Sequence, residues 1–140
     1  MTDHRYSLRI YYEDTDASGV VYHANYLRYA ERARTEAMRD ATIAHADMAA
    51  EHGLIFMVRR VKLDYLAPAR LDDLLTVATR VSELRGASVG IAQTISRDGT
   101  VLVMADLLLA CVRAEDAKPA RIPPRWRDAL SAMVRPGLAS

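Results

Sequence analysis

The sequence is poor in cysteine, and its opposite charges almost cancel. Its 140 residues include one cysteine, Cys111, so no disulfide can form within the chain, which fits a reducing compartment. The 19 Lys and Arg residues against 18 Asp and Glu residues leave a net charge of +1, whereas a nucleic-acid binder would carry a strong basic excess. The N-terminus has no apolar signal-peptide run, and no stretch of ~18 apolar residues could span a membrane. These absences favour a soluble cytoplasmic protein with no nucleic-acid partner and no membrane insertion.

Several kinds of functional site also lack the residues they need. The sequence has no Gly-rich phosphate loop and no nucleophile-elbow serine, and Cys111 lies in an apolar segment that predicts an inert core thiol. We therefore expect no metal and no cofactor. The histidines show no metal-ligand spacing with a carboxylate or the cysteine: His4, His23, His45 and His52.

The apolar residues, 51% of the chain, are enough to form a core without metal or disulfide support, and the length suits one domain over residues 1–140. Alternation predicts a first strand at residues 5–12, followed by turn-forming residues at 13–19. Helical periodicity then predicts a long helix over residues 24–40 and a shorter one over 44–52, closed by Gly53. The expected buried stripe of the long helix is rich in alanine: Leu27, Ala30, Ala37 and Ala41.

The second half of the chain alternates with a period of two. Residues 54–66 predict a long strand whose apolar phase slips near Arg59 and Arg60, which indicates a β-bulge. Three further strands are expected over residues 73–84, 87–96 and 100–113, joined at Arg85-Gly86 and Asp98-Gly99. A terminal helix is expected over residues 125–133. The order predicts an α+β protein in which one long helix packs on a five-stranded antiparallel sheet whose last four strands form a meander.

Three acids crowd the turn before the long helix: Glu13, Asp14 and Asp16. Such a composition is common in a solvated turn that caps a helix, so by itself it does not establish a catalytic site.

The same segment resembles the signature of the 4-hydroxybenzoyl-CoA thioesterase family of hotdog-fold proteins, most closely its Tol–Pal-associated acyl-CoA thioesterases. The matching residues are D-T-D-A-x-G-V-V-Y-H-x-N-Y from Asp14 to Tyr26 and E-R-A-R-T at residues 31–35. A second block, D-Y-L-x-P-A-R-L-D-D-L-L, spans residues 64–75, and a weaker match covers residues 105–112. The blocks follow one another along nearly the whole chain.

The resemblance implies a hotdog fold and an acyl-CoA thioester hydrolase acting on a short- to medium-chain or aromatic acyl-CoA. It implies that Asp16 is the catalytic carboxylate, as general base or as nucleophile, and that the backbone N–H of His23 polarises the thioester carbonyl. It also implies a homodimer or homotetramer with the active site between two subunits. The alternative is a non-catalytic module that binds acyl-CoA or acyl-carrier protein at the cell-envelope machinery. A hotdog dehydratase is a weaker alternative, because His23 has no second proton-transfer group on the helix.

The remaining residues of the signature have structural interpretations as well as functional ones. Glu13 and Asp14 could shape the turn, and Asp14 could instead act directly in catalysis. Gly19 could permit a positive φ or a close substrate approach, and the His23 ring could orient the water or the carboxylate or cap the helix. Glu31 could pair with Arg34 at a spacing of three. Tyr22 and Tyr26 are expected to pack near an acyl pocket. Basic residues that could meet CoA phosphates are scattered and define no site: Arg59, Arg60, Lys62, Arg85, Lys118 and Arg121.

Overall fold

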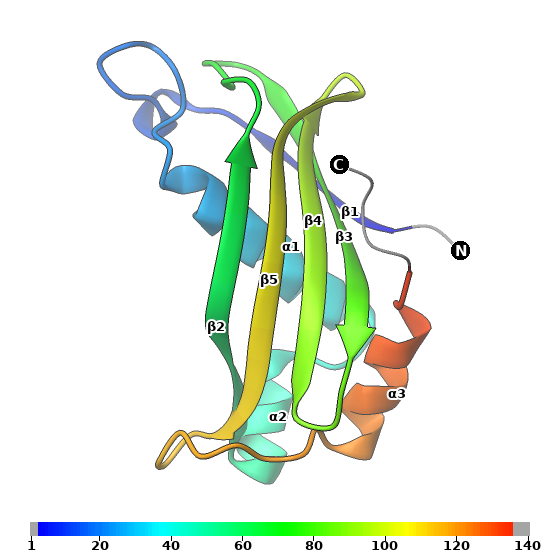
Figure 1. The fold of residues 1–140 in the computed structure, drawn as a ribbon. Helices are drawn as coiled ribbons and strands as arrows, with labels where there is room; N and C mark the ends of the chain where they lie inside the picture. Colours follow the sequence, from blue (N-terminus) through cyan, green and yellow to red (C-terminus); the bar gives the residue numbers. More distant parts are fainter. Residues whose placement is uncertain (1–2, 136–140) are drawn as a thin grey trace.

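The computed structural model describes residues 3–135, which form one antiparallel sheet with helices packed against it (Figure 1). The strands are β1 (His4–Arg9), β2 (Leu54–Tyr65), β3 (Leu74–Leu84), β4 (Ser88–Arg97) and β5 (Thr100–Arg113). The helices are α1 (Asn25–Asp40), α2 (His45–His52) and α3 (Pro124–Ala132), with a 3₁₀ turn, η1 (Tyr12–Asp14), between β1 and α1. The α+β class and the five-stranded antiparallel sheet are confirmed.

The strand order β1-β3-β4-β5-β2 corrects the expected four-strand meander. Only β3, β4 and β5 follow one another across the sheet, and β2 pairs with β5 instead of β3. The segment that connects β2 to β3 is bonded to distant parts of the chain. The Val21 N–H donates to the Ala69 carbonyl and the Ile10 N–H to the Asp73 carbonyl, each at 2.9 Å. These non-local bonds, together with Pro68, prevent a tight hairpin between β2 and β3.

Local backbone features agree with the sequence pattern. The register of β2 against β5 shifts between Val58 and Arg60, where the β-bulge was expected. Gly53 closes α2 in the left-handed conformation, with φ of 66°. Asp98 and Gly99 both have positive φ in the tight β4–β5 turn. The first strand ends earlier than expected, at Arg9, because the chain turns into η1 at Tyr12.

The buried face of α1 differs from the expected alanine stripe. Leu27 is 37% exposed, whereas Tyr26, Tyr29 and Ala33 are buried against the sheet. The alanines Ala30 and Ala37 are buried as expected. The aromatic residues near the start of the helix therefore contribute to the core beside the candidate site.

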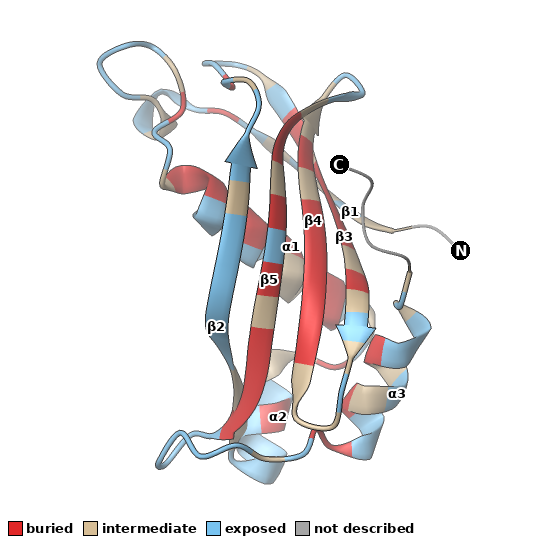
Figure 2. Cartoon of the chain, in the orientation of Figure 1, coloured by how far each residue is buried: buried red, intermediate tan, exposed pale blue. Residues whose placement is uncertain are grey.

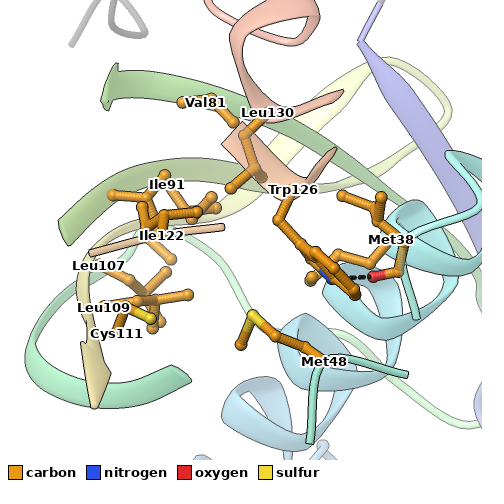
Figure 3. Close-up of a cluster of buried hydrophobic side chains, with 13 residues drawn as sticks. Met38, Met48, Val81, Ile91, Leu107, Leu109, Cys111, Ile122, Trp126 and Leu130 are labelled. Carbon is orange, nitrogen blue, oxygen red and sulfur yellow. Dashed lines mark hydrogen bonds between the residues drawn. The ribbon is translucent and has the colours of Figure 1, made fainter. Parts of the chain in front are cut away.

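Two clusters of buried side chains fill the space between sheet and helices. One lies beneath α3 and α2 and includes Trp126, Leu130, Met48 and Cys111 (Figure 3). The other lies under the first turns of α1 and includes Tyr26 and other residues close to the acidic turn. Burial is greatest along β4 and β5, whereas β2 is mostly exposed (Figure 2).

Candidate active site

A short loop before α1 carries Asp16 at the surface. Thr15 and Val21 form an isolated antiparallel β-bridge, and the Asp16 N–H donates to the Val20 carbonyl at 2.9 Å. The Gly19 N–H donates back to the Asp16 carbonyl at 3.0 Å, and Gly19 has φ of 82°, a conformation that favours glycine. The expectation that Gly19 permits a positive φ is confirmed, and the turn presents the Asp16 side chain to solvent.

The Asp16 carboxylate is held through one of its two oxygens. The Ser18 N–H donates to Asp16 Oδ1 at 2.8 Å, and the Ser18 hydroxyl donates to the same oxygen. The hydrogen bond from the Ser18 hydroxyl, followed by that from its N–H, lowers the pKa of Asp16, and the nearby His23 adds a smaller effect of the same sign. The carboxylate is therefore ionised at neutral pH.

His23 lies two residues before the first residue of α1, on the chain segment that leaves the Asp16 loop. Its backbone N–H has no acceptor within residues 3–135, and its carbonyl accepts a hydrogen bond from the Tyr65 hydroxyl at 3.2 Å. Its ring is exposed and packs against that of Tyr22, with centroids 4.6 Å apart. An unpaired N–H at a helix N-terminus is suited to a developing negative charge.

In a single chain, Asp16 and His23 line different surface hollows. The hollow beside Asp16 is lined by Tyr12, Thr15, Asp16, Ala17, Gly19 and Leu71. The hollow beside His23 is mostly apolar and is lined by Val21, His23, Tyr26, Tyr65, Leu66, Ala67 and Pro68. The fold thus places the two residues within electrostatic reach on one segment, but it does not enclose them in one cavity.

Asp14 shapes the entrance to this segment. Its carboxylate accepts the Tyr11 N–H at 2.7 Å, and its carbonyl accepts both the Tyr22 N–H and the Asn25 side-chain amide at 3.0 Å. These contacts support a turn-shaping role for Asp14. Asn25 is only 8% exposed, and sequence reasoning gave it no role. A polar residue in the first turn of a helix, if it is buried, needs a hydrogen-bond partner, and this was the feature of the sequence that could have indicated its role.

Two tyrosines of α1 fix its start against the rest of the fold. Tyr26 is buried, and its hydroxyl accepts the Ala69 N–H at 3.0 Å, which ties the helix to the connection after β2. Tyr29 is also buried, and its hydroxyl has no hydrogen-bond partner among the described residues. Burial, and after it the nearby Asp14 carboxylate, raises the Tyr29 pKa. Tyr22, expected to pack near the site, is 48% exposed.

The partner of Arg34 is not the expected Glu31. The Arg34 guanidinium donates to the Gln93 side-chain oxygen at 3.1 Å, and no ion pair joins Arg34 to Glu31 among the described residues. Gln93 is fully buried on β4 and donates in turn to the Ala30 carbonyl and the Thr79 hydroxyl, each at 2.9 Å. Burial lowers the Arg34 pKa, and Glu31 opposes this from a distance.

The candidate phosphate ligands do not form a cluster. Arg59, Arg60 and Lys62 lie along the exposed edge strand β2. Arg85 pairs with Glu83, and the Arg121 guanidinium lies near Gly86, at the β3–β4 turn. That turn is at the opposite end of the sheet from the loop that carries Asp16 (Figure 1). Within residues 3–135 we find no group of three or more side chains suited to a metal ion, and no helix long and apolar enough to cross a membrane.

Comparison with known proteins points to one superfamily. Residues 11–130 match the model of the thioesterase-like superfamily. The acyl-CoA thioesterase YbgC of Haemophilus influenzae is 44% identical over 125 residues, 88% of this chain and 92% of that protein. The acyl-CoA thioester hydrolase YbgC of Escherichia coli O6:H1 is 43% identical over 120 residues, 85% of this chain and 89% of that protein.

A solved structure gives the same result in three dimensions. The probable thioesterase from Bartonella henselae superposes with a TM-score of 0.82 at 40% sequence identity, covering 86% of this chain and 99% of that one. The family match covers most of the chain, including the loop with Asp16 and the start of α1. The chain therefore belongs to the thioesterase-like superfamily and has its hotdog fold.

Proposed function

We propose that this protein is an acyl-CoA thioesterase that hydrolyses a short- to medium-chain or aromatic acyl-CoA with the side chain of Asp16. One observation carries the proposal. The segment that enters α1 holds both the ionised, exposed carboxylate of Asp16 and the unpaired backbone N–H of His23. Relatives that share more than 40% of their residues with this chain carry the names of acyl-CoA thioesterases, which supports the same substrate class.

Asp16 supplies the nucleophilic side of the reaction. As a general base it removes a proton from a water molecule whose oxygen attacks the thioester carbonyl carbon. As a nucleophile its free oxygen attacks the same carbon, and water then hydrolyses the mixed anhydride. Both routes consume one water and release the carboxylic acid and the CoA thiol.

The N–H of His23 supplies the electrophilic side. During attack the carbonyl oxygen becomes negatively charged, and a donor already fixed at the start of a helix stabilises that charge without reorganising. The Tyr65 hydroxyl bonds the carbonyl of the same residue, which limits its movement.

A single carboxylate is adequate because the leaving group is a thiolate. If the CoA thiol resembles that of cysteine, its pKa is about 8.5, so the thiolate departs without the protonation that an amide nitrogen requires. No second acid is then needed on the leaving-group side.

The first experiment measures thiol release from short-chain, long-chain and aromatic acyl-CoAs by the wild type and by Asp16→Asn. The substitution keeps the size of the side chain and removes its charge, so we expect kcat to fall by ~10²-fold or more, as for a lost acid–base group. Glu13→Gln is the matched control, because Glu13 is an exposed carboxylate three residues away.

The outcomes separate the candidate functions. Thiol release that is lost in Asp16→Asn and kept in Glu13→Gln supports the proposal. Equal turnover by Asp16→Asn and wild type assigns the chemistry to another residue. Binding of acyl-CoA without thiol release from any substrate identifies a binding module.

We further propose a homodimer formed through β2. This strand is an edge of the sheet, twelve residues long, and its far side presents unpaired backbone groups. Met57, Val58 and Val61 are 42%, 47% and 40% exposed, an apolar surface that a second copy would cover. Antiparallel pairing of two β2 strands about a twofold axis extends the sheet and brings two copies of the hollow beside His23 toward the interface.

Analytical ultracentrifugation tests this assembly. Placing two lysines on the edge, Val58→Lys with Val61→Lys, is expected to convert the dimer to a monomer by charge repulsion and loss of apolar burial. Ser7→Lys, on the opposite edge strand β1, is the control and should leave the dimer intact. A double variant that sediments like the wild type contradicts the β2 interface.

A further inference from the structure

We propose that Ser18 is a positioning residue that occupies one oxygen of Asp16 and leaves the other for the reaction. This inference rests on the proposed thioesterase function and adds a residue to it. The motif that surrounds Asp16 specifies no residue at position 18, where this chain has serine.

The geometry assigns different tasks to the two carboxylate oxygens. Both donors of Ser18, its N–H at 2.8 Å and its hydroxyl, bond to Oδ1. Within residues 3–135 no other donor reaches the carboxylate at ordinary hydrogen-bond geometry, and the nearby Val20 N–H lowers the Asp16 pKa by a smaller amount than Ser18 does. A carboxylate held through one oxygen has a restricted side-chain rotation, because turning it would break both bonds. Oδ2 is therefore presented in one direction at the surface of the loop.

The backbone turn supports this arrangement independently of the side chains. Asp16, Ser18 and Gly19 lie in a reverse turn closed by the bond from the Gly19 N–H to the Asp16 carbonyl, so the Ser18 N–H remains near Oδ1. The hydroxyl is the part of the interaction that depends on the identity of the side chain. Its removal leaves the turn and one of the two bonds in place.

The hydroxyl also affects the charge of Asp16. A donor to the ionised form lowers the pKa of a carboxyl, and Ser18 is the principal cause of the lowered Asp16 pKa. The other groups that face Asp16 are few. His23 acts in the same direction with a smaller effect, and Tyr12 is the titratable residue that lines the same hollow. The charged residue Arg70 also lies next to this loop, because its backbone forms an antiparallel β-bridge with Val20.

Ser18 therefore keeps Asp16 ionised to lower pH than the turn alone would. Without the hydroxyl, the Asp16 pKa rises and the carboxylate is protonated earlier as the solution is acidified. The acid limb of the pH profile of kcat/KM, which reports groups of the free enzyme, is then displaced to higher pH. A merely structural loss would lower the profile at every pH without displacing its limb.

The experiment compares the pH profiles of kcat/KM for wild type, Ser18→Ala, Ser18→Thr and Thr15→Ala. We expect the acid limb of Ser18→Ala to move to higher pH, and that of Ser18→Thr, which keeps the hydroxyl, to remain near the wild type. Thr15→Ala is the matched control: it removes a hydroxyl of the same loop that donates to the Tyr12 carbonyl and not to the Asp16 carboxylate. Coincident limbs for Ser18→Ala and wild type, or an equal shift in Thr15→Ala, overturn the proposal.

A second measurement is independent of catalysis. The titration of the Asp16 carboxyl carbon, followed by NMR and assigned with Asp16→Asn, should show a higher pKa in Ser18→Ala than in the wild type. An unchanged titration overturns the role of Ser18 even where thiol release depends on Asp16. A raised pKa supports it even if Asp16→Asn retains turnover, in which case the proposed function fails separately.

Discussion

The hydroxyl of Tyr65, near the end of edge strand β2, donates to the carbonyl of His23 at a distance of 3.2 Å. The two residues are 42 positions apart in the sequence, and their contact joins the sheet edge to the entrance of α1. The Tyr65 ring also meets that of Tyr26 edge-on, with centroids 5.7 Å apart. The backbone that presents the His23 N–H is thus supported from the strand that we propose as the dimer edge.

Replacing Tyr65 by phenylalanine should lower kcat with little effect on folding. The ring contact is kept, and only the hydroxyl that holds the His23 carbonyl is lost. Because a hydrogen bond contributes about 0.5–1.5 kcal/mol, we expect a decrease in kcat of about 2- to 10-fold, measured by thiol release. Tyr6→Phe is the control, since its hydroxyl makes no hydrogen bond within residues 3–135. A Tyr65→Phe enzyme as active as Tyr6→Phe contradicts this role.

The buried contact between Arg34 and Gln93 should appear as a strong coupling in a double-mutant cycle. Gln93→Leu leaves the Arg34 guanidinium without its hydrogen-bond acceptor, so we expect a loss of about 2–4 kcal/mol in the free energy of unfolding. Arg34→Met removes the charge that then lacks a partner. The double variant should therefore lose less than the sum of the single variants, by about 1 kcal/mol or more in urea denaturation. Additive losses would show that the two side chains act independently.

Local features of this fold could be predicted from the sequence, and non-local ones could not. The bulge near Arg59 and the closure of α2 by Gly53 follow from residues within a few positions of each other. The pairing of β2 with β5 depends on contacts across the fold, and alternation within a strand does not identify the neighbouring strand.

In the candidate site, too, some features could be predicted from the sequence and others could not. The motif gave the positions of Asp16 and His23, which lie on one short segment. The contacts of Ser18 were not predicted because the motif leaves position 18 open, and a hydroxyl can bond to several groups in a turn. The partners of Asn25 and Arg34 were missed for another reason. Each lies on a different element, and spacing along the helix favoured Glu31 for the arginine.

Asp73 should stabilise the fold in a pH-dependent way. Burial opposes its ionisation, but hydrogen bonds from the Arg70 N–H at 2.8 Å and the Arg97 guanidinium at 2.7 Å outweigh burial and lower its pKa below 3.8. Because the folded pKa lies below the unfolded one, this stability is complete above the unfolded value and is lost as the pH falls through the folded value. Asp73→Asn should cost about 1–2 kcal/mol at pH 7.

Urea denaturation of Asp73→Asn and wild type at several pH values measures this effect. The difference in unfolding free energy should shrink as the pH falls through the ordinary range of an aspartate carboxyl, because the unfolded chain binds its proton there while the folded chain keeps the carboxylate ionised to lower pH. Asp72→Asn is the control, since Asp72 is exposed and asparagine tolerates its φ of 70°. A difference that is constant down to the lowest pH contradicts the assignment.

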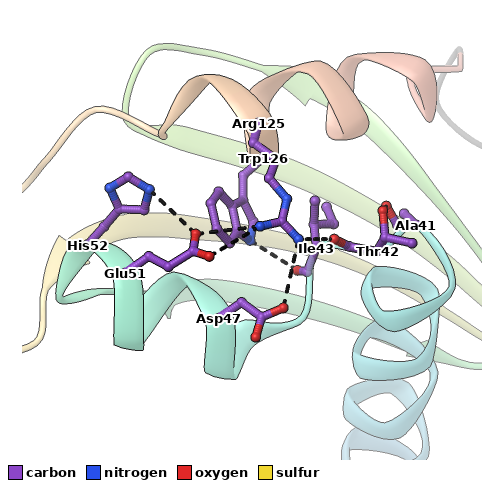
Figure 4. Close-up of polar contacts among 8 residues, drawn as sticks. All are labelled: Ala41, Thr42, Ile43, Asp47, Glu51, His52, Arg125 and Trp126. Carbon is purple, nitrogen blue, oxygen red and sulfur yellow. Dashed lines mark hydrogen bonds and ion pairs between the residues drawn. The ribbon is translucent and has the colours of Figure 1, made fainter.

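Trp126 and Arg125 are neighbours on α3, yet they should contribute very unequally to stability (Figure 4). Trp126 is fully buried, and its indole N–H donates to the Ile43 carbonyl at 3.0 Å, which fixes α3 to the segment before α2. Trp126→Phe removes ring volume from the core and leaves that carbonyl unpaired, so we expect a loss of about 2–4 kcal/mol.

Arg125 makes more contacts than Trp126, but its side chain is partly exposed to solvent. It lies over the Trp126 ring at 4.9 Å and pairs with Glu51 at 3.4 Å, while its side chain remains 48% exposed. Water screens such pairs, so Arg125→Gln should cost less than about 1 kcal/mol. Circular dichroism in urea measures both variants, because the only tryptophan is absent from one of them. Losses of equal size would contradict this ranking, because the exposed contacts of Arg125 would then stabilise α3 as much as the buried indole does.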